Sequence, residues 1–392
     1  MPPDRWFAVG LADASEDNAG ERAADAALIH DDAKLLIVFS SVSDNLPALI
    51  SQIHSRSGGV PLIGCTTAGE IAPGGPRDGS IVVAALGGGG FAVGTAAAAG
   101  ASEDLRGAGA RAARCLPSPA GHPHQVLLLL TDGLASDQEE IVRGAYSVLG
   151  AGVPMVGGCA GDGLKMTTTF QFHGDRVLTD SVVAAGIAST GPIGIGVRHG
   201  WRAVGEPMLV TTSGPNEVES LDGRPALDVF LERLGAGPGG AGGLGEIGPD
   251  GFPGLALMHP FGLSRHSGEE QVRFITSADF AARSLSCTAQ VPQGSLVWLM
   301  EGDTGAVLEA TDAATNASLA ALGDVPPIGL LTFDCVARRG ALGDRGIEQE
   351  IGRIADVAGD APFAGFYSYG EIARTRGMRS LYNYTLVVLS VA

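Results

Sequence analysis

GCTTAGEIA at residues 64–72 and GFYSYGEIA at residues 365–373 are two versions of one motif within this sequence. They lie far apart in the chain, yet both begin with glycine and both end in Gly-Glu-Ile-Ala. A weaker copy, GGCAGDG, lies between them at residues 157–163. A motif that recurs in this way indicates an internal repeat, and a repeat fixes the units into which the chain has to be divided.

The segments that precede the three motifs share one order: a continuous apolar run, a helical segment, and a short second apolar run that contains proline. The apolar runs predict buried strands, and glycines mark the ends of helices. The predicted strands are 35–39, 126–130 and 329–333, and the predicted helices are 46–56, 136–149 and 346–358.

A strand, a helix and a second strand predict parallel βαβ pairing. Each motif then lies just past the carboxyl end of a strand, where open α/β sheets bind their ligands. We therefore predict an α/β fold of repeated βαβ-like units, with glycine-rich turns at the strand ends. We also expect residues 64–72 and 365–373 to lie close together in space.

The chain has 392 residues, which is more than one hydrophobic core usually organises. The repeat pattern stops near residue 200, where a different pattern of strands begins. We predict two intimately packed domains, residues 1–200 and 201–392. They should share a large interface, because the third repeat completes the pattern of the first two. The glycine-rich stretch 235–254 predicts a flexible loop.

Composition limits the possible partners. The formal net charge of −18 disfavours binding to nucleic acid and to anionic membranes. The first residues lack a basic segment followed by an apolar one, and the apolar runs are too short to span a bilayer. Five scattered cysteines form no zinc-type spacing, so we predict no metal and no cofactor, and we expect a reducing cytoplasmic location.

Glu70 and Glu371 follow the last glycine of the first and third motifs. Glycine allows a close approach between backbone and ligand. A carboxylate beside such a turn could hold an ammonium group, while backbone amides could hold a carboxylate, and an amino acid presents both groups. The alternative, which the sequence leaves open, is that both glutamates bond to structural groups.

Other polar and aromatic residues cluster near the third motif and at the last strand, where they could supply an aromatic wall, a thiol, a cation, an amide and a hydroxyl. The predicted ligand-binding set is Cys335, Arg338, Tyr369, Glu371, Asn383 and Thr385. Secondary candidates are Cys65, Thr66, Glu70 and Tyr367. Core packing or structural hydrogen bonding is the alternative role for each.

The motifs at 64–70 and 365–372, together with FDCVARR at 333–339, GIGVRHGW at 194–201 and the closing Asn-Tyr-Thr, resemble the FIST family over nearly the whole chain. Tyr382 stands where this family often has histidine. The resemblance implies paired N-terminal and C-terminal FIST domains that form a sensory module for amino acids or related metabolites. It also implies a stand-alone sensor whose signalling partner acts in trans.

Two other functions remain open at this stage. A cysteine- or serine-based hydrolase could use the same pocket, with Cys335 as the first nucleophile to test and His199 or His259 as distant bases. The motif at 365–370 lacks the spacing of a nucleophile elbow, and the chain has no P-loop. A scaffold with a vestigial pocket is the second alternative.

Overall fold

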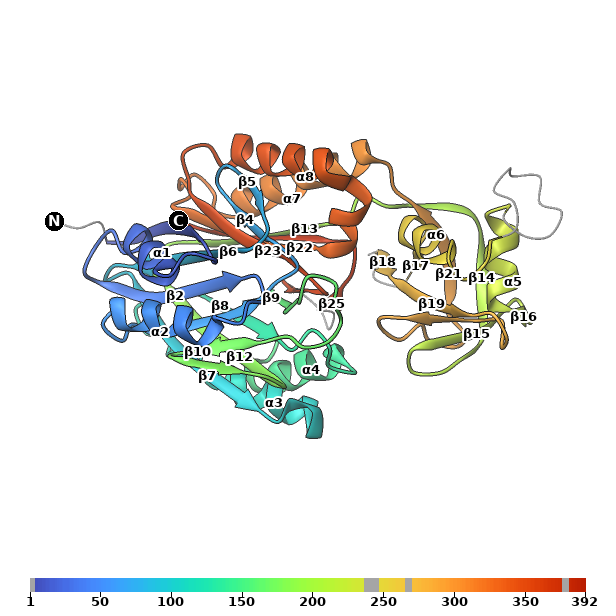
Figure 1. Ribbon diagram of the computed structural model, residues 1–392, viewed down its shortest axis with the longest axis horizontal. Coiled ribbons are helices and arrows are strands. Elements are labelled where there is room, and N and C mark those ends of the chain that lie inside the picture. The colour runs from blue at the N-terminus through green and yellow to red at the C-terminus, as the bar shows by residue number, and fades with distance from the viewer. Residues whose placement is uncertain (1–3, 236–246, 265–269, 376–380) are drawn as a thin grey trace.

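The computed structural model describes residues 4–235, 247–264, 270–375 and 381–392. Figure 1 shows two bodies: a large one that contains both chain ends, and a smaller one built from β14 to β21. The large body is mixed α/β, as the sequence predicts. No helix in the described ranges is long and apolar enough to cross a membrane.

Three units of the same topology make up the large body. In each unit, three strands pair antiparallel and a fourth joins parallel to the third. The first unit has strands β1 (Trp6–Asp13), β6 (Ser80–Gly87), β2 (Ala33–Ser40) and β3 (Leu62–Thr66). The second has β7 (Phe91–Ala99), β12 (Ser181–Ser189), β8 (His124–Thr131) and β9 (Met155–Cys159). The third has β13 (Ile193–Arg198), β26 (Leu386–Val391), β22 (Gly329–Cys335) and β23 (Phe363–Ser368).

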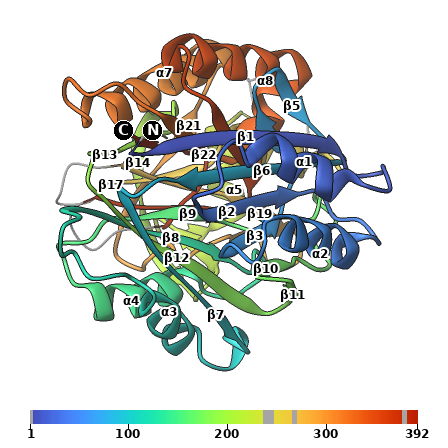
Figure 2. The ribbon, with the colours of Figure 1, turned by 90° about the vertical axis from the view of Figure 1, so that its left-hand side faces the viewer.

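Two helices accompany each unit. They are α1 (Ala19–Ala27) and α2 (Leu46–Arg56), α3 (Leu105–Ala113) and α4 (Gln138–Leu149), and α7 (Thr304–Ala320) and α8 (Val336–Ala358). In α2 the buried residues Leu46, Leu49, Ile50 and Ile53 recur at helical spacing, so one face packs on the sheet. Figure 2 shows the three helix pairs on the outside of the body, around the strands.

A short strand at the end of the first and third motifs, and one after the second motif, leaves its own unit and joins another. From the first unit β4 (Glu70–Ala72) pairs with β23, and from the second unit β10 (Gln171–His173) pairs with β3. From the third unit β24 (Glu371–Arg374) pairs with β9. The short strands β5 (Gly75–Arg77), β11 (Arg176–Leu178) and β25 (Leu381–Tyr382) extend these exchanged edges.

This exchange confirms the prediction that the first and third motifs lie together. Glu70 is the register partner of Phe366, and the Ala68 N–H donates to the Tyr367 carbonyl at 2.9 Å. Glu70, Gln171 and Glu371 open the three exchanged strands, so Gln171 takes the position of the two glutamates in the second unit.

A close backbone approach explains why each motif has a glycine on its incoming strand. A Cβ atom on Gly64 would lie 2.2 Å from the carbonyl oxygen of Val38 on the adjacent parallel strand. On Gly365 the same atom would lie 2.0 Å from the Thr332 oxygen. Only glycine avoids these overlaps, so the repeat is visible in the sequence.

The three sheets enclose one shared apolar core. Strands of every unit contribute to it, and Phe39, Phe333 and Phe366 pack against one another with ring centroids 4.8 to 6.3 Å apart. Aromatic pairs of this kind add about 0.5–1.5 kcal/mol each beyond their buried area. The units therefore stabilise one another.

The smaller body, which we call the inserted body, lies in the chain between β13 and α7 of the third unit. Its sheet contains β14 (Arg202–Ser213), β15 (Glu217–Leu221), β16 (Arg224–Pro225), β17 (Phe261–Ser264), β18 (Glu270–Arg273), β19 (Ile275–Asp279), β20 (Ser284–Cys287) and β21 (Leu296–Glu301). Helices α5 (Ala226–Arg233) and α6 (Phe252–Met258) cover it. The predicted boundary at residue 200 falls where the chain enters this body, and the division into 1–200 and 201–392 stays a prediction.

Two local predictions need correction. The third helix begins at Val336 rather than at 346, and its chain direction changes at Gly343, whose φ of 63° is non-helical. Its glycines obscure the helical pattern in the sequence. Helix α6 starts within the predicted flexible loop 235–254, because Phe252 and Ala256 bury against the inserted body. Residues 236–246 of that loop lie outside the described residues.

Candidate ligand-binding site

A pocket of about 700 Å³ lies at the carboxyl ends of the central strands of the large body. We call it the first pocket. Its walls are residues 41–42 and 67–69 of the first unit, residues 162–165 of the second unit, and residues of the first turns of α8 from the third unit. All three units meet here because β4 carries the first motif onto the third unit.

Both signs of charge line the first pocket. Arg339 from α8 binds Asp78 through two hydrogen bonds, of 2.8 and 2.6 Å, and its guanidinium lies 5.0 Å from the ring centroid of Tyr367. Lys165 and Asp344 also line the pocket. Among the described residues, neither of these two side chains has a hydrogen-bond or ion-pair partner. A ligand could therefore engage them without breaking a contact within the protein.

Tyr369 holds the segment 162–168 that forms one wall of this pocket. Its hydroxyl donates to Asp162 and accepts from the backbone N–H groups of Asp162 and Leu164, at 3.2 and 2.8 Å. The Asp162 carboxylate also accepts from the N–H groups of residues 166 to 168. Burial alone would raise the pKa of Asp162, but these hydrogen bonds lower it to about 2.

Glu371 and Cys335 lie together in the interior, away from the first pocket. Ser368 Oγ donates to Glu371 Oε1 at 2.7 Å, and the Thr385 N–H donates to Oε2 at 3.3 Å. Burial raises the pKa of Glu371 to about 8, although these donors and the Cys335 thiol oppose the rise. Burial therefore favours the protonated acid over the anion, and Glu371 is not an exposed charge.

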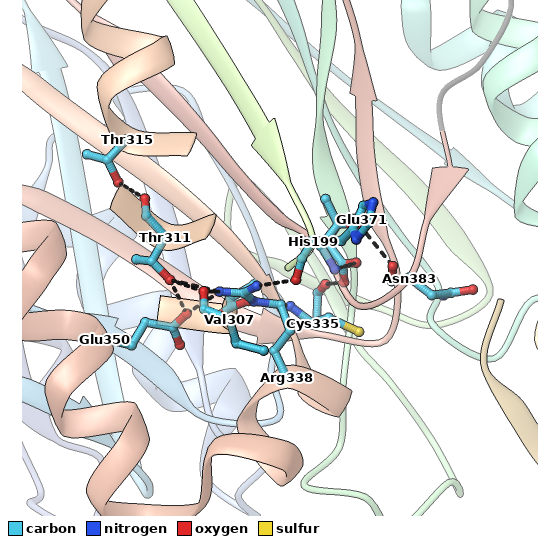
Figure 3. A network of polar contacts seen from close by, with 12 residues as sticks. His199, Val307, Thr311, Thr315, Cys335, Arg338, Glu350, Glu371 and Asn383 are labelled. Carbon is cyan, nitrogen blue, oxygen red and sulfur yellow. Dashed lines mark hydrogen bonds and ion pairs between the residues drawn. The ribbon is translucent and has the colours of Figure 1, made fainter. Parts of the chain in front are cut away.

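Arg338 is fully buried, with acceptors on every side (Figure 3). Its Nε donates to Asp334 at 2.7 Å, Nη1 donates to the His199 carbonyl at 2.8 Å, and Nη2 donates to Thr311 at 2.8 Å and to Glu350. This network joins β22, α7 and α8, and it uses all three arms of the guanidinium.

The remaining members of the predicted set lie around other cavities. Asn383 lines a smaller cavity together with Tyr369, and its Oδ1 accepts from Thr288 Oγ1 of the inserted body at 2.7 Å. Thr385 lines a separate cavity, and its hydroxyl donates to the Asn383 carbonyl at 2.9 Å. The six predicted residues thus lie close in the fold but do not line one pocket.

The secondary candidates are buried as well. Glu70 accepts from Ser41, Ser80 and Thr67, and burial raises its pKa while these donors oppose the rise. Thr66 Oγ1 accepts from the Phe170 N–H at 2.9 Å. Cys65 and Tyr367 lie in the core, where burial raises the pKa of each well above its usual value.

The cysteines bear on the hydrolase alternative. Burial raises the pKa of Cys335 well above its usual value, and it raises that of Cys159 to about 12. A thiol that keeps its proton is a poor nucleophile. Within the described ranges no histidine side chain is hydrogen-bonded to Cys335, and the Nδ1 of His199 instead accepts from the Trp201 N–H.

The charged residues that line the first pocket are not among those predicted from the sequence. Arg339 stands next to a predicted residue, and Asp344 lies in a stretch we did not assign to the helix. Lys165 is one of only two lysines in the chain, which is a compositional signal that could have identified it. No group of three His, Cys, Asp or Glu side chains in the described residues is placed to hold a metal ion.

Two family models match this chain. The model of the FIST N domain matches residues 34–224, and that of the FIST C domain matches residues 226–374. An uncharacterized protein of Mycobacterium tuberculosis is 26% identical over 264 residues, which are 67% of each chain. An uncharacterized protein of Mycobacterium bovis is 25% identical over 243 residues, 60% of this chain and 59% of that one.

Among solved structures, a chorismatase matches 98% of both chains with a TM-score of 0.35 and 10% identity. The two family matches together cover most of the sequence, and the motifs that repeat in it lie inside them or at their edge. The chain therefore belongs to the FIST family, whose domains are sensory modules that bind small ligands.

Proposed function

We propose that this protein is a cytoplasmic sensor that binds an amino acid or a similar zwitterionic metabolite in the first pocket and passes its output to a separate signalling protein. The main supporting observation is that Lys165 and Asp344, an exposed cation and an exposed anion, line one pocket without partners in the described chain. A carboxylate and an ammonium group on one small molecule match this pair.

The position of the pocket supports the same proposal. It lies at the carboxyl ends of strands, where sheets of this class bind ligands, and all three units contribute to its walls. A ligand that contacts several units can change their arrangement, which a sensor requires. The five cysteines are all free in the structure, which supports the cytoplasmic setting.

The predicted set stays part of the proposal in a modified role. Tyr369 fixes the 162–165 wall through Asp162, and Arg338 anchors the start of α8, next to Arg339 in the pocket wall. In this proposal these residues hold the pocket in shape, while Lys165 and Asp344 contact the ligand.

The test is a thermal-shift screen of the common L-amino acids, followed by calorimetry on the best binder. Lys165→Gln and Asp344→Asn should each weaken binding about fivefold, because one exposed charge pair contributes about 1 kcal/mol. Lys34→Gln is the matched control, since Lys34 lies near the opposite end of β2 from Ser41.

Two results would contradict the proposal. One is a screen in which no amino acid raises the unfolding temperature. The other is a binder whose affinity is the same in wild type, Lys165→Gln and Asp344→Asn.

A further inference from the structure

A second cavity of about 350 Å³ lies where the large body meets the inserted body. We call it the junction cavity. Residues 133–136 and 369–370 line it from the large body, and Phe274, Thr276 and Thr288 line it from the inserted body. Its walls therefore come from two bodies that Figure 1 shows side by side.

The junction cavity is the counterpart of the first pocket in the repeat. In the first pocket, the turn before β4 faces the corner between β22 and α8. In the junction cavity, the turn before β24 faces the corner between β8 and α4. Because the strand exchange places each turn against the neighbouring unit, a cavity forms at the equivalent position in two of the units.

The chemistry of the two places differs. Every described residue that lines the junction cavity is uncharged, whereas the first pocket has both signs of charge. The polar lining side chains are amides and hydroxyls: Gln138, Asn216, Asn383, Ser136, Thr276, Thr288 and Tyr369. A zwitterion would lose its hydration here without gaining a charged partner, so this cavity favours a neutral molecule.

One polar group that lines the junction cavity, the amide nitrogen of Asn383, is open to a ligand. The Asn383 side chain is 3% exposed, and its Oδ1 accepts from Thr288. Its amide nitrogen has no hydrogen bond to any described residue. An amide N–H that faces a cavity is free to donate, and a carbonyl oxygen on a ligand would accept from it.

Apolar side chains gather at the same cavity although they are open to solvent. Leu134, Leu164 and Met166 line it and are 36%, 63% and 59% exposed. Leu164 and Met166 also have φ angles of 65° and 53°, which are unfavourable for residues other than glycine. Asp162 and Tyr369 hold this backbone in place. A ligand with an apolar side chain would cover these groups.

We propose that the junction cavity is a second ligand site, for an uncharged amide with an apolar side chain, such as a blocked amino acid. The carbonyl oxygen of the ligand accepts from the Asn383 amide, and its side chain packs on Leu134, Leu164 and Met166. This site is distinct from the first pocket, and the proposal does not rest on whether an amino acid binds there.

The experiment uses the full chain labelled with ¹³C-methyl methionine, titrated with N-acetyl-L-leucinamide and, separately, with L-leucine. Met166 lines the junction cavity and not the first pocket, so its methyl signal reports on this site. Met208 is the internal control, because it is buried in the inserted body. We expect the blocked amide to shift the Met166 signal strongly and in a saturable way, and L-leucine to shift it less, through the shared 162–165 wall only.

Two variants test whether the blocked amide binds in the junction cavity. Leu134→Gln removes exposed apolar surface and should weaken binding of the amide about fivefold. Asn383→Ala removes the donor, with Asn316→Ala on the exposed face of α7 as its matched control. The proposal is overturned if the amide leaves Met166 unshifted, if L-leucine shifts it equally, or if Leu134→Gln binds the amide like the wild type.

Discussion

Replacing Glu371 by glutamine should make the stability of the protein less sensitive to a rise in pH from about 4.5 to about 8. Burial raises the pKa of Glu371 from its ordinary value of 4.5 to about 8. Ser368, Thr385, Cys335 and the Arg338 charge oppose this rise but do not cancel it. The folded protein therefore holds a proton that the unfolded chain releases between these two pH values.

The sign of the effect follows from this difference in bound protons. Where the folded state binds more protons, stability falls as the pH rises. The contribution of Glu371 is fully present below pH 4.5 and is lost as the pH rises to about 8. Because one pKa unit corresponds to about 1.4 kcal/mol, the full loss is about 5 kcal/mol.

Glutamine has the shape of the protonated acid and no charge to bury. Its oxygen can accept from the Thr385 N–H while its nitrogen donates to Ser368 Oγ, so both present contacts persist. We expect Glu371→Gln to match the wild type near pH 4.5 and to exceed its free energy of unfolding by several kcal/mol at pH 9.

Urea unfolding followed by circular dichroism at half-unit steps from pH 4.5 to 9.5 measures this difference directly. Glu348→Gln is the control, because Glu348 is an exposed glutamate on α8. If the stability difference between Glu371→Gln and the wild type stays constant over this range, the carboxyl of Glu371 does not hold its proton in the folded state, and the reasoning is wrong.

Two further changes test the interior. Gly365→Ala should destabilise the fold by about 3 kcal/mol or more, since its Cβ would lie 2.0 Å from the Thr332 backbone oxygen. Gly352→Ala, in the open part of α8, should instead stabilise the fold by about 1 kcal/mol. Equal effects of the two changes in urea unfolding would rule out the close strand approach. Arg338→Leu should lower the free energy of unfolding by about 3–5 kcal/mol, because it leaves Asp334 and Glu350 buried without their cation. Adding Glu350→Gln to this variant should recover part of the loss. An Arg338→Leu variant as stable as the wild type would show that the network is dispensable.

The repeat could be predicted because the same structural requirements place glycines and long apolar strands at equivalent positions in its copies. Gly64 and Gly365 are required by the adjacent parallel strand, and the long apolar strands before them are unmistakable. The strand exchange could not be predicted, because strands of three or four residues such as β4 and β24 have little pattern of their own. Which unit they join depends on the packing of the whole body.

The site was harder to predict than the fold, for a related reason. Glu371 looks like a ligand group in the sequence, but it opens an exchanged strand, and its carboxyl contacts Ser368, Thr385 and Cys335 in the interior. Because Cys335 and Thr385 lie outside the motif that contains Glu371, its burial cannot be predicted from the local sequence. Lys165 and Asp344 are solvated charges in irregular or glycine-rich segments, and no periodicity marks their position at a pocket.

The strand exchange also leads us to expect that binding at the two proposed sites is coupled. Leu164 and Val336 line both of them, and Tyr369 lines the junction cavity while its hydroxyl holds the 162–165 wall of the first pocket. A molecule that orders this shared wall from one side changes the cost of ordering it for a molecule on the other side. Binding free energies coupled in this way are reciprocal, so each ligand alters the affinity for the other by the same factor. The strand exchange thus places two cavities on one wall, and if both bind ligands as proposed, this contact would let the protein combine two chemical signals.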